Sequence, residues 1–129
     1  MEPLKIPATS NTPEVDFDFD RNCFSLKGES HPEDVTAFYQ PVMDPLEVHL
    51  GNLGDGTCEF VLEFIYFNSS SAKIVMTLMD MIDEAAEAGA TVNVKWVYDP
   101  EDDNMLELGE EFGEDLEYAK FELVAQESE

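Results

Sequence analysis

The feature that most constrains the fold is an apolar run that passes directly into an amphipathic segment. The run CEFVLEFIYF, residues 58–67, is apolar on both faces apart from Glu59 and Glu63, which is typical of a central strand covered on two sides. Residues 69–89, SSSAKIVMTLMDMIDEAAEAG, have apolar residues at helical spacing and end on a glycine, as helices commonly do. The sequence therefore predicts a buried strand followed at once by a long helix.

Two further strands are expected before this unit. Residues 14–20, EVDFDFD, alternate strictly between apolar and acidic side chains, which is the pattern of a half-buried strand. Residues 23–28, CFSLKG, return after a short turn, so the two segments predict a hairpin.

Residues 30–50 predict a helix with an interruption. Ser30 is the expected N-cap, and Pro32 lies in the first turn. Pro41 and Pro45 each remove a helical N–H and clash with the preceding turn, at a cost of about 3 kcal/mol in a helix interior. We therefore expect a kink or two short helices.

The rest of the chain alternates strand, helix and strand. Residues 91–99 and 118–126 have strand character, and residues 100–116 predict an acidic helix. The order β-β-α-β-α-β-α-β predicts an α/β fold, on the border of α+β, with one mixed sheet packed by three helices, in which right-handed crossovers make the last three strands parallel. We expect one domain, residues 1–129, with residues 1–12 and 126–129 as loose ends.

The net charge excludes several kinds of partner. Thirty Asp and Glu face six Lys and Arg, a formal charge of −24, which disfavours nucleic acid and anionic membrane surfaces. Solubility or a salty habitat explains such acidity, and so does a protein partner with a basic face. Because we find neither a signal-peptide pattern nor an apolar run of spanning length, we expect no membrane insertion and a cytoplasmic location.

The sequence does not match the motifs of common enzymes or metal sites. His31 and His49 have no partner at ligand spacing, and a calcium loop starting at Asp16 is excluded by Arg21 and Lys27 at its sixth and twelfth positions. Cys23 and Cys58 are expected to be small buried thiols. We predict no enzymatic activity, no cofactor and no metal.

The hydroxyl cluster after Asn68 is the strongest candidate site. Ser69 or Ser70 is expected to cap the helix by accepting from a free backbone N–H, yet a cap needs only one of the three serines. A phosphate on Ser69, Ser70 or Ser71 would face the positive end of the helix dipole, with Lys73 one turn along. The same phosphate would add nearly two negative charges to any surface that the turn helps to form.

The helix itself offers a surface for a partner. Its apolar arc spans roughly 200°, wider than one core face usually needs, which indicates either a deeply buried helix or an exposed edge that includes some methionines. The residues that we expect to bind a partner are Asn68, Lys73, Met76, Thr77 and Asp80.

Five stretches, in order along nearly the whole chain, resemble one family. They are IPATSNTPEV, FSLKGESHPED, YFNSSSAKIVMTLMDMID, VKWVYD and ELGEEFGEDLEY. With these stretches the chain resembles the SiaC-type bacterial regulators, whose fold is similar to that of STAS domains.

The resemblance implies a phosphorylation switch in place of an enzyme. A dedicated kinase would phosphorylate the hydroxyl after the Asn of the motif, here Ser69, and a metal-dependent phosphatase would remove the phosphate. The unphosphorylated form would activate a diguanylate cyclase in a cyclic di-GMP and biofilm pathway. Family examples have threonine at this position, so Ser70 and Ser71 remain alternative acceptors. A constitutive acidic interaction module and an unrecognised enzyme remain rival hypotheses.

Overall fold

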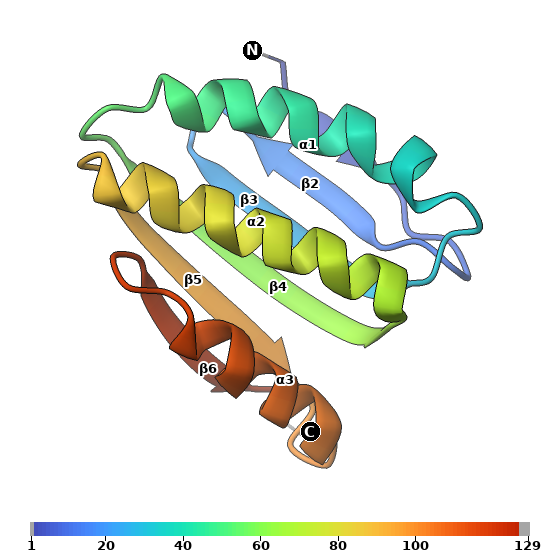
Figure 1. Ribbon diagram of the computed structural model, residues 1–129. Helices are drawn as coiled ribbons and strands as arrows, with labels where there is room; N and C mark the ends of the chain where they lie inside the picture. The colour runs from blue at the N-terminus through green and yellow to red at the C-terminus, as the bar shows by residue number, and fades with distance from the viewer. Residues whose placement is uncertain (1, 127–129) are drawn as a thin grey trace.

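The fold is one six-stranded sheet with three helices, described for residues 2–126 by a computed structural model (Figure 1). The strands follow chain order across the sheet, with β1 to β3 antiparallel and β3 to β6 parallel. The predicted mixed sheet, its three helices and the order β-β-α-β-α-β-α-β from β2 onward are confirmed. The elements are β1 Leu4–Ile6, β2 Glu14–Asp18, β3 Cys23–Ser30, α1 Val35–Gly51, β4 Thr57–Phe67, α2 Ser69–Glu87, β5 Thr91–Tyr98, α3 Asp103–Glu114 and β6 Lys120–Ala125.

The expectation that residues 1–12 form a loose end is wrong for β1. This short strand pairs antiparallel with β2, with Lys5 opposite Asp16. Leu4 and Ile6 are half-buried against the core, so β1 is held by apolar contacts as well as by backbone hydrogen bonds. Three residues are too few to show a period along the sequence. At the other end, residues 127–129 lie outside the described residues.

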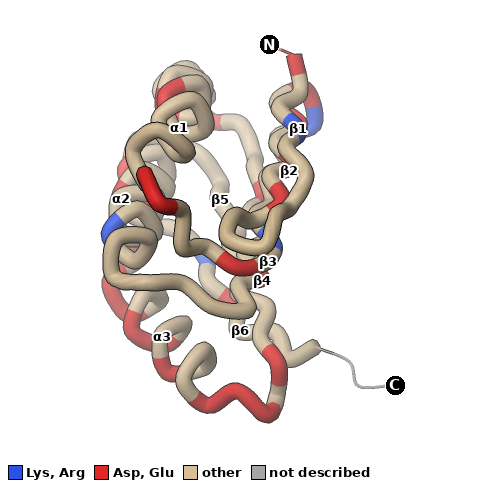
Figure 2. Tube along the Cα trace, turned by 90° about the vertical axis from the view of Figure 1, so that its right-hand side faces the viewer, with Lys and Arg blue, Asp and Glu red and all other residues tan. Residues whose placement is uncertain are grey.

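All three helices cover the same face of the sheet. Figure 2 shows the helices on one side and the strands on the other. The reason is topological: β3, β4, β5 and β6 are laid down in one direction, and right-handed crossovers in one direction all pass over one face. Within residues 2–126, no helix lies over the opposite face of the sheet, which we call the open face (Figure 2).

The prediction that residues 58–67 are covered on two sides is therefore wrong. β4 is central, but its burial alternates: Phe60 and Leu62 are buried under the helices, whereas Val61 is only half-buried on the open face. Glu59 and Glu63 lie on this face as well and are only partly buried. Glu59 and Glu63 are four residues apart and therefore lie on the same face of the strand. These two charges were the sequence signal for an open face.

Helix α1 starts later than predicted and is continuous. Ser30 is the last residue of β3, and the N-cap is Asp34, whose side chain accepts from the backbone N–H of Ala37 at 3.0 Å. The expected division into two short helices does not occur, although Pro41 and Pro45 both lie inside the helix. Pro41 is exposed, so water can satisfy the carbonyl groups that the prolines leave without donors.

The largest fully buried side chain of the core is that of Trp96 in β5. Its indole Nε1 donates to the backbone carbonyl of Met105 in α3 at 3.0 Å. Phe112, also in α3, packs against the same ring at 5.5 Å between centroids. The amphipathic pattern that predicted α3 is thus satisfied by packing onto β5.

The two cysteines differ in exposure. Cys58 is buried, and burial, followed by the nearby Cys23, raises the pKa of its thiol to about 11. Cys23 is exposed at the start of β3, so the expectation of two buried thiols is wrong for this residue.

A single carboxylate ties α2 to the loop before β6. Asp83 accepts the backbone N–H groups of Glu117, Tyr118 and Ala119 at 2.8–3.2 Å. Burial disfavours the charged carboxylate, but the hydrogen bonds from Tyr118, Ala119 and Glu117 outweigh it, and the pKa of Asp83 is lowered. The contact therefore stabilises the fold only while Asp83 is ionised.

We predict that Asp83→Asn lowers the free energy of unfolding by about 1 kcal/mol at pH 7, because charge-assisted hydrogen bonds to a partly exposed group are lost. A lowered folded-state pKa contributes stability that is present above the unfolded value of about 3.9 and is lost as the pH falls through the folded value. Urea unfolding at pH 7 and at a pH below the folded-state pKa of Asp83 measures this difference. The control is Asp80→Asn, an exposed position on the same helix. An equal loss for Asp83→Asn at both pH values would contradict the role of charge.

Candidate functional site

The candidate site is the turn from β4 into α2. β4 ends at the buried Phe67, and the backbone N–H of Asn68 donates to the carbonyl of Ser30 at 3.1 Å. The Asn68 side chain accepts from the backbone N–H of Ser71 at 3.0 Å. Asn68 is thus the N-cap, and the prediction that Ser69 or Ser70 caps the helix is wrong. Asn competes well with Ser for this role, so the hydroxyls of Ser69 and Ser70 are not needed as caps.

The three serines occupy different environments. Ser69 and Ser70 are exposed at the first two positions of α2, whereas Ser71 is fully buried. Ser71 accepts from the hydroxyl of Ser30 at 2.8 Å, and Ser30 in turn bonds to the hydroxyl of Tyr39. Burial raises the pKa of Tyr39, an effect that its bond to Ser30 opposes. This buried chain of hydroxyls fastens the turn to β3 and α1.

The start of α2 is favourable to an anion despite the acidity of the chain. Its first turn contains no acidic residue, and Lys73 is exposed one turn along. The backbone N–H groups of Ser69 and Ser70 belong to the first turn of the helix. N–H groups in this turn have no carbonyl acceptor within the helix. An added negative charge would therefore meet the positive end of the helix dipole.

The exposed side of α2 extends from this turn as one strip. Lys73, Met76, Thr77 and Asp80 are all exposed, and Met76 keeps 54% of its surface accessible. At ~100° per residue, Ser69 lies in line with Lys73, Met76 and Asp80. We call Ser69, Lys73, Met76, Thr77 and Asp80 the α2 strip.

The wide apolar arc of α2 is mostly used in the core. Val75, Leu78, Met79 and Ile82 are buried, and Met81 is half-buried. Of the methionines in α2, Met76 is the exposed one. The exposed edge is therefore a narrow mixed strip, not a groove lined by methionines.

Sequence reasoning missed the residues that support the turn from other elements. Ser30 was assigned to a helix cap, and no role at the turn was predicted for Tyr39. Tyr66, one residue before the end of β4, is 51% exposed, and its ring packs edge-on against His31 at 5.7 Å. No local signal in the sequence indicates this contact, because Tyr66 falls within the strand predicted over residues 58–67 and His31 within the helix predicted over residues 30–50.

The described residues bring together no evident catalytic set. Within residues 2–126, no group of three or more His, Cys, Asp or Glu is placed to hold a metal ion. His49 lies on α1, where its Nε2 is 2.6 Å from Oδ1 of Asn22, while His31 lies beyond β3 at 3.8 Å from Glu29. The same range contains no helix with the length and apolarity needed to cross a membrane.

The fold and the turn define a class of small α/β protein in which an exposed hydroxyl begins the helix after the central strand. The chain belongs to the SiaC family of regulatory phosphoproteins, whose model matches residues 6–126. The resemblance inferred from the five sequence stretches is thereby confirmed.

Solved structures and a curated relative agree with this assignment. The crystal structure of apo-SiaC from Pseudomonas aeruginosa is 35% identical, with a TM-score of 0.84 over 98% of this chain and 100% of that one. SiaC in complex with the diguanylate cyclase SiaD, of which it is the activator, is 34% identical, with a TM-score of 0.89 over 95% and 99%. An uncharacterized protein of P. aeruginosa strain UCBPP-PA14 is 35% identical over 92% of this chain and 93% of its own.

Proposed function

We propose that this chain is a non-enzymatic regulator that binds and activates a diguanylate cyclase while Ser69 is unmodified and loses this activity when Ser69 is phosphorylated. The observation that carries the proposal is the exposed Ser69 hydroxyl at the start of α2, in line with the α2 strip. Family membership and the likeness to a SiaC bound to a cyclase support the kind of partner.

The environments of the three serines favour Ser69 as the acceptor. A kinase must reach the hydroxyl, and the Ser71 hydroxyl is fully buried in the chain with Ser30 and Tyr39. Ser70 is exposed but lies about 100° around the helix from Ser69, at the edge of the α2 strip beside Thr77. Only Ser69 combines accessibility with a position on the line of Lys73 and Met76.

A phosphate on Ser69 is compatible with the folded turn. It would lie beside the free N–H groups of the first turn and within one turn of Lys73, so modification needs no unfolding. The phosphate would carry about −1.5 to −2 charges. Its effect would fall on docking, because a partner covering the α2 strip would have to desolvate it.

The proposal places the chain in a cytoplasmic pathway with three kinds of partner. These are the cyclase, a Ser/Thr kinase that modifies Ser69, and a metal-dependent phosphatase that reverses the modification. We take residues 1–129 as one regulatory domain. Asn68 would act with the α2 strip at the contact with the cyclase, since its half-buried side chain orders the turn.

Phosphopeptide mass spectrometry of the protein from its native cells, with and without phosphatase treatment, tests the modified position. We expect one phosphate, on Ser69, that is lost in a Ser69→Ala variant and kept in Ser70→Ala, the matched exposed control. A phosphate on Ser71 would contradict the assignment, because that hydroxyl is inaccessible in the fold.

An acidic module that binds without modification is the second candidate. The three helices carry two acidic residues in α1, four in α2 and five in α3, with Lys73 as their one lysine, which favours a basic partner on the helical side. Binding that weakens steeply with salt, with Ser69 unmodified under all growth conditions, would favour this candidate.

A further inference from the structure

The open face of the sheet differs from the rest of the molecule in charge. Of the six Lys and Arg residues in the chain, Lys73 lies on α2. The other five lie on the sheet or in its turns: Lys5, Arg21, Lys27, Lys95 and Lys120. They alternate with carboxylates, so the open face is nearly neutral on a protein of −24.

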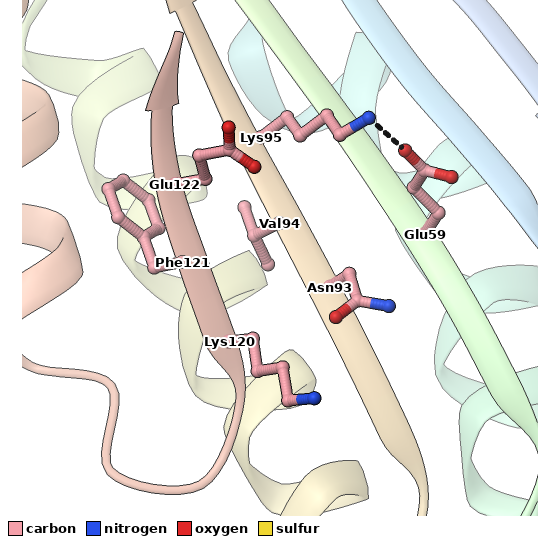
Figure 3. A pocket seen from close by; sticks show the side chains of 7 residues that line it. All are labelled: Glu59, Asn93, Val94, Lys95, Lys120, Phe121 and Glu122. Carbon is pink, nitrogen blue, oxygen red and sulfur yellow. Dashed lines mark ion pairs between the residues drawn. The ribbon is translucent and has the colours of Figure 1, made fainter.

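Two ion pairs on the open face show how its charges are arranged. Lys27 of β3 lies 3.4 Å from Glu63 of β4, and Lys95 of β5 lies 3.0 Å from Glu59 of β4. Figure 3 shows the second pair, with Glu122 of β6 next to Lys95 and Lys120 of the same strand opposite Asn93. Because Lys27, Lys95 and Lys120 are exposed, each can also meet a carboxylate of another molecule.

One row of residues crosses all six strands of the open face. The strand registers place in it, in order, Lys5, Asp16, Ser25, Val61, Lys95 and Glu122. Read from its two ends inward, the row pairs Lys5 with Glu122, Asp16 with Lys95, and Ser25 with Val61. Each charged residue thus has its opposite at the mirrored position, and the two central residues are small.

This arrangement is complementary to itself under a two-fold rotation. An axis along the strands, between β3 and β4, would lay β3 of one copy on β4 of the other, and β2 on β5. It would bring Asp16 to Lys95 and Lys27 to Glu63 of the second copy, in each case twice. Two-fold dimers require such self-complementary patches, and sheets that pack face to face lie about 10 Å apart with strands within about 30°.

The lack of cover is itself unusual for these strands. Strands β3 to β6 are parallel, and parallel strands are generally covered on both faces. Val97 and Val124 are paired on the same face and only half-buried. By contrast, the three helices carry eleven acidic residues and one lysine, so the helical side would repel a second copy.

We propose that the open face is a homodimer interface, in which a second copy of this chain docks by a two-fold axis between β3 and β4. The site is distinct from the Ser69 turn and does not depend on the proposed function. At physiological salt, where charges more than about 8 Å apart are screened, the remaining repulsion between the outward helical sides is small.

Sedimentation of the full chain at 0.15 M salt tests the proposal, with two charge-reversal variants. We expect wild type to form a dimer, and Asp16→Lys and Lys95→Glu each to weaken it on the order of tenfold or more, because each sets like charges across the axis. An equimolar mixture of the two variants should restore the dimer, since both cross-chain contacts are then attractive. Lys73→Glu, the same charge change on the helical side, should leave the dimer intact.

The contrary results are equally clear. Wild type that stays monomeric up to about 1 mM, a dimer unaffected by Asp16→Lys and Lys95→Glu, or a mixture that does not associate would each overturn the proposal. The thiol of Cys23, exposed on β3 next to the axis, gives a readout that needs no variant. Its rate of labelling should fall as wild type is concentrated, and a constant rate would also speak against this interface.

Discussion

Phosphorylation of Ser69 is expected to weaken binding to the cognate diguanylate cyclase by on the order of 10⁴-fold, the change that moves a docking equilibrium from 99:1 to 1:99. The cause is the cost of desolvating about two added charges beneath a docked partner. Ser69→Asp carries a single charge, so we expect a smaller loss, about 10- to 100-fold. Binding assays and the rate of cyclic di-GMP synthesis with purified cyclase measure both effects.

The exposed serine next in sequence supplies the matched control. Ser69→Ala should bind and activate as wild type does, because only the added charge opposes docking. Ser70→Asp should lose less than Ser69→Asp, since residue 70 lies at the edge of the α2 strip beside Thr77, about 100° around the helix from Ser69. If Ser69→Asp bound as tightly as Ser69→Ala, the electrostatic mechanism would be weakened and the phosphorylated protein itself would have to be compared.

The second large effect is expected at Gly109 in the middle of α3. A Cβ atom at this position would lie 2.5 Å from Cδ1 of Trp96 and 2.9 Å from Cδ2 of Leu123. Trp96 cannot move away, because it is fully buried and its Nε1 is bonded to Met105. We expect Gly109→Ala to lower the free energy of unfolding by about 1–3 kcal/mol, even though alanine is the better helix former.

Urea unfolding followed by the fluorescence of Trp96, the one tryptophan of the chain, measures this effect. The matched control is Gly51→Ala at the end of α1, where a Cβ atom would meet no other atom within 4 Å. That variant should be neutral or more stable by up to about 1 kcal/mol. Equal stabilities of the two variants would show that α3 moves away from the sheet without cost.

The candidate site was located by sequence, but its internal arrangement was not. An apolar strand, Asn68, three serines and an amphipathic helix are local patterns, so the turn and the exposure of Lys73 and Thr77 could be predicted. That Asn68 rather than a serine caps α2 depends on a competition between neighbouring side chains with nearly equal capping preference. The burial of Ser71 depends on Ser30, which lies 41 residues earlier in the chain.

By itself the sequence determined the order of the elements from β2 onward, the parallel strands joined by right-handed crossovers, and the amphipathic faces of α2 and α3. These follow from residue periodicity and chain handedness, which act over short distances along the chain. Only the tertiary structure decided that all helices share one face, that α1 continues through Pro41 and Pro45, and that β1 joins the sheet. Each of these depends on how the segments pack in three dimensions: the crossovers lie on one side of the sheet, Pro41 lies on the exposed side of α1, and Leu4 and Ile6 pack against a core that other strands supply.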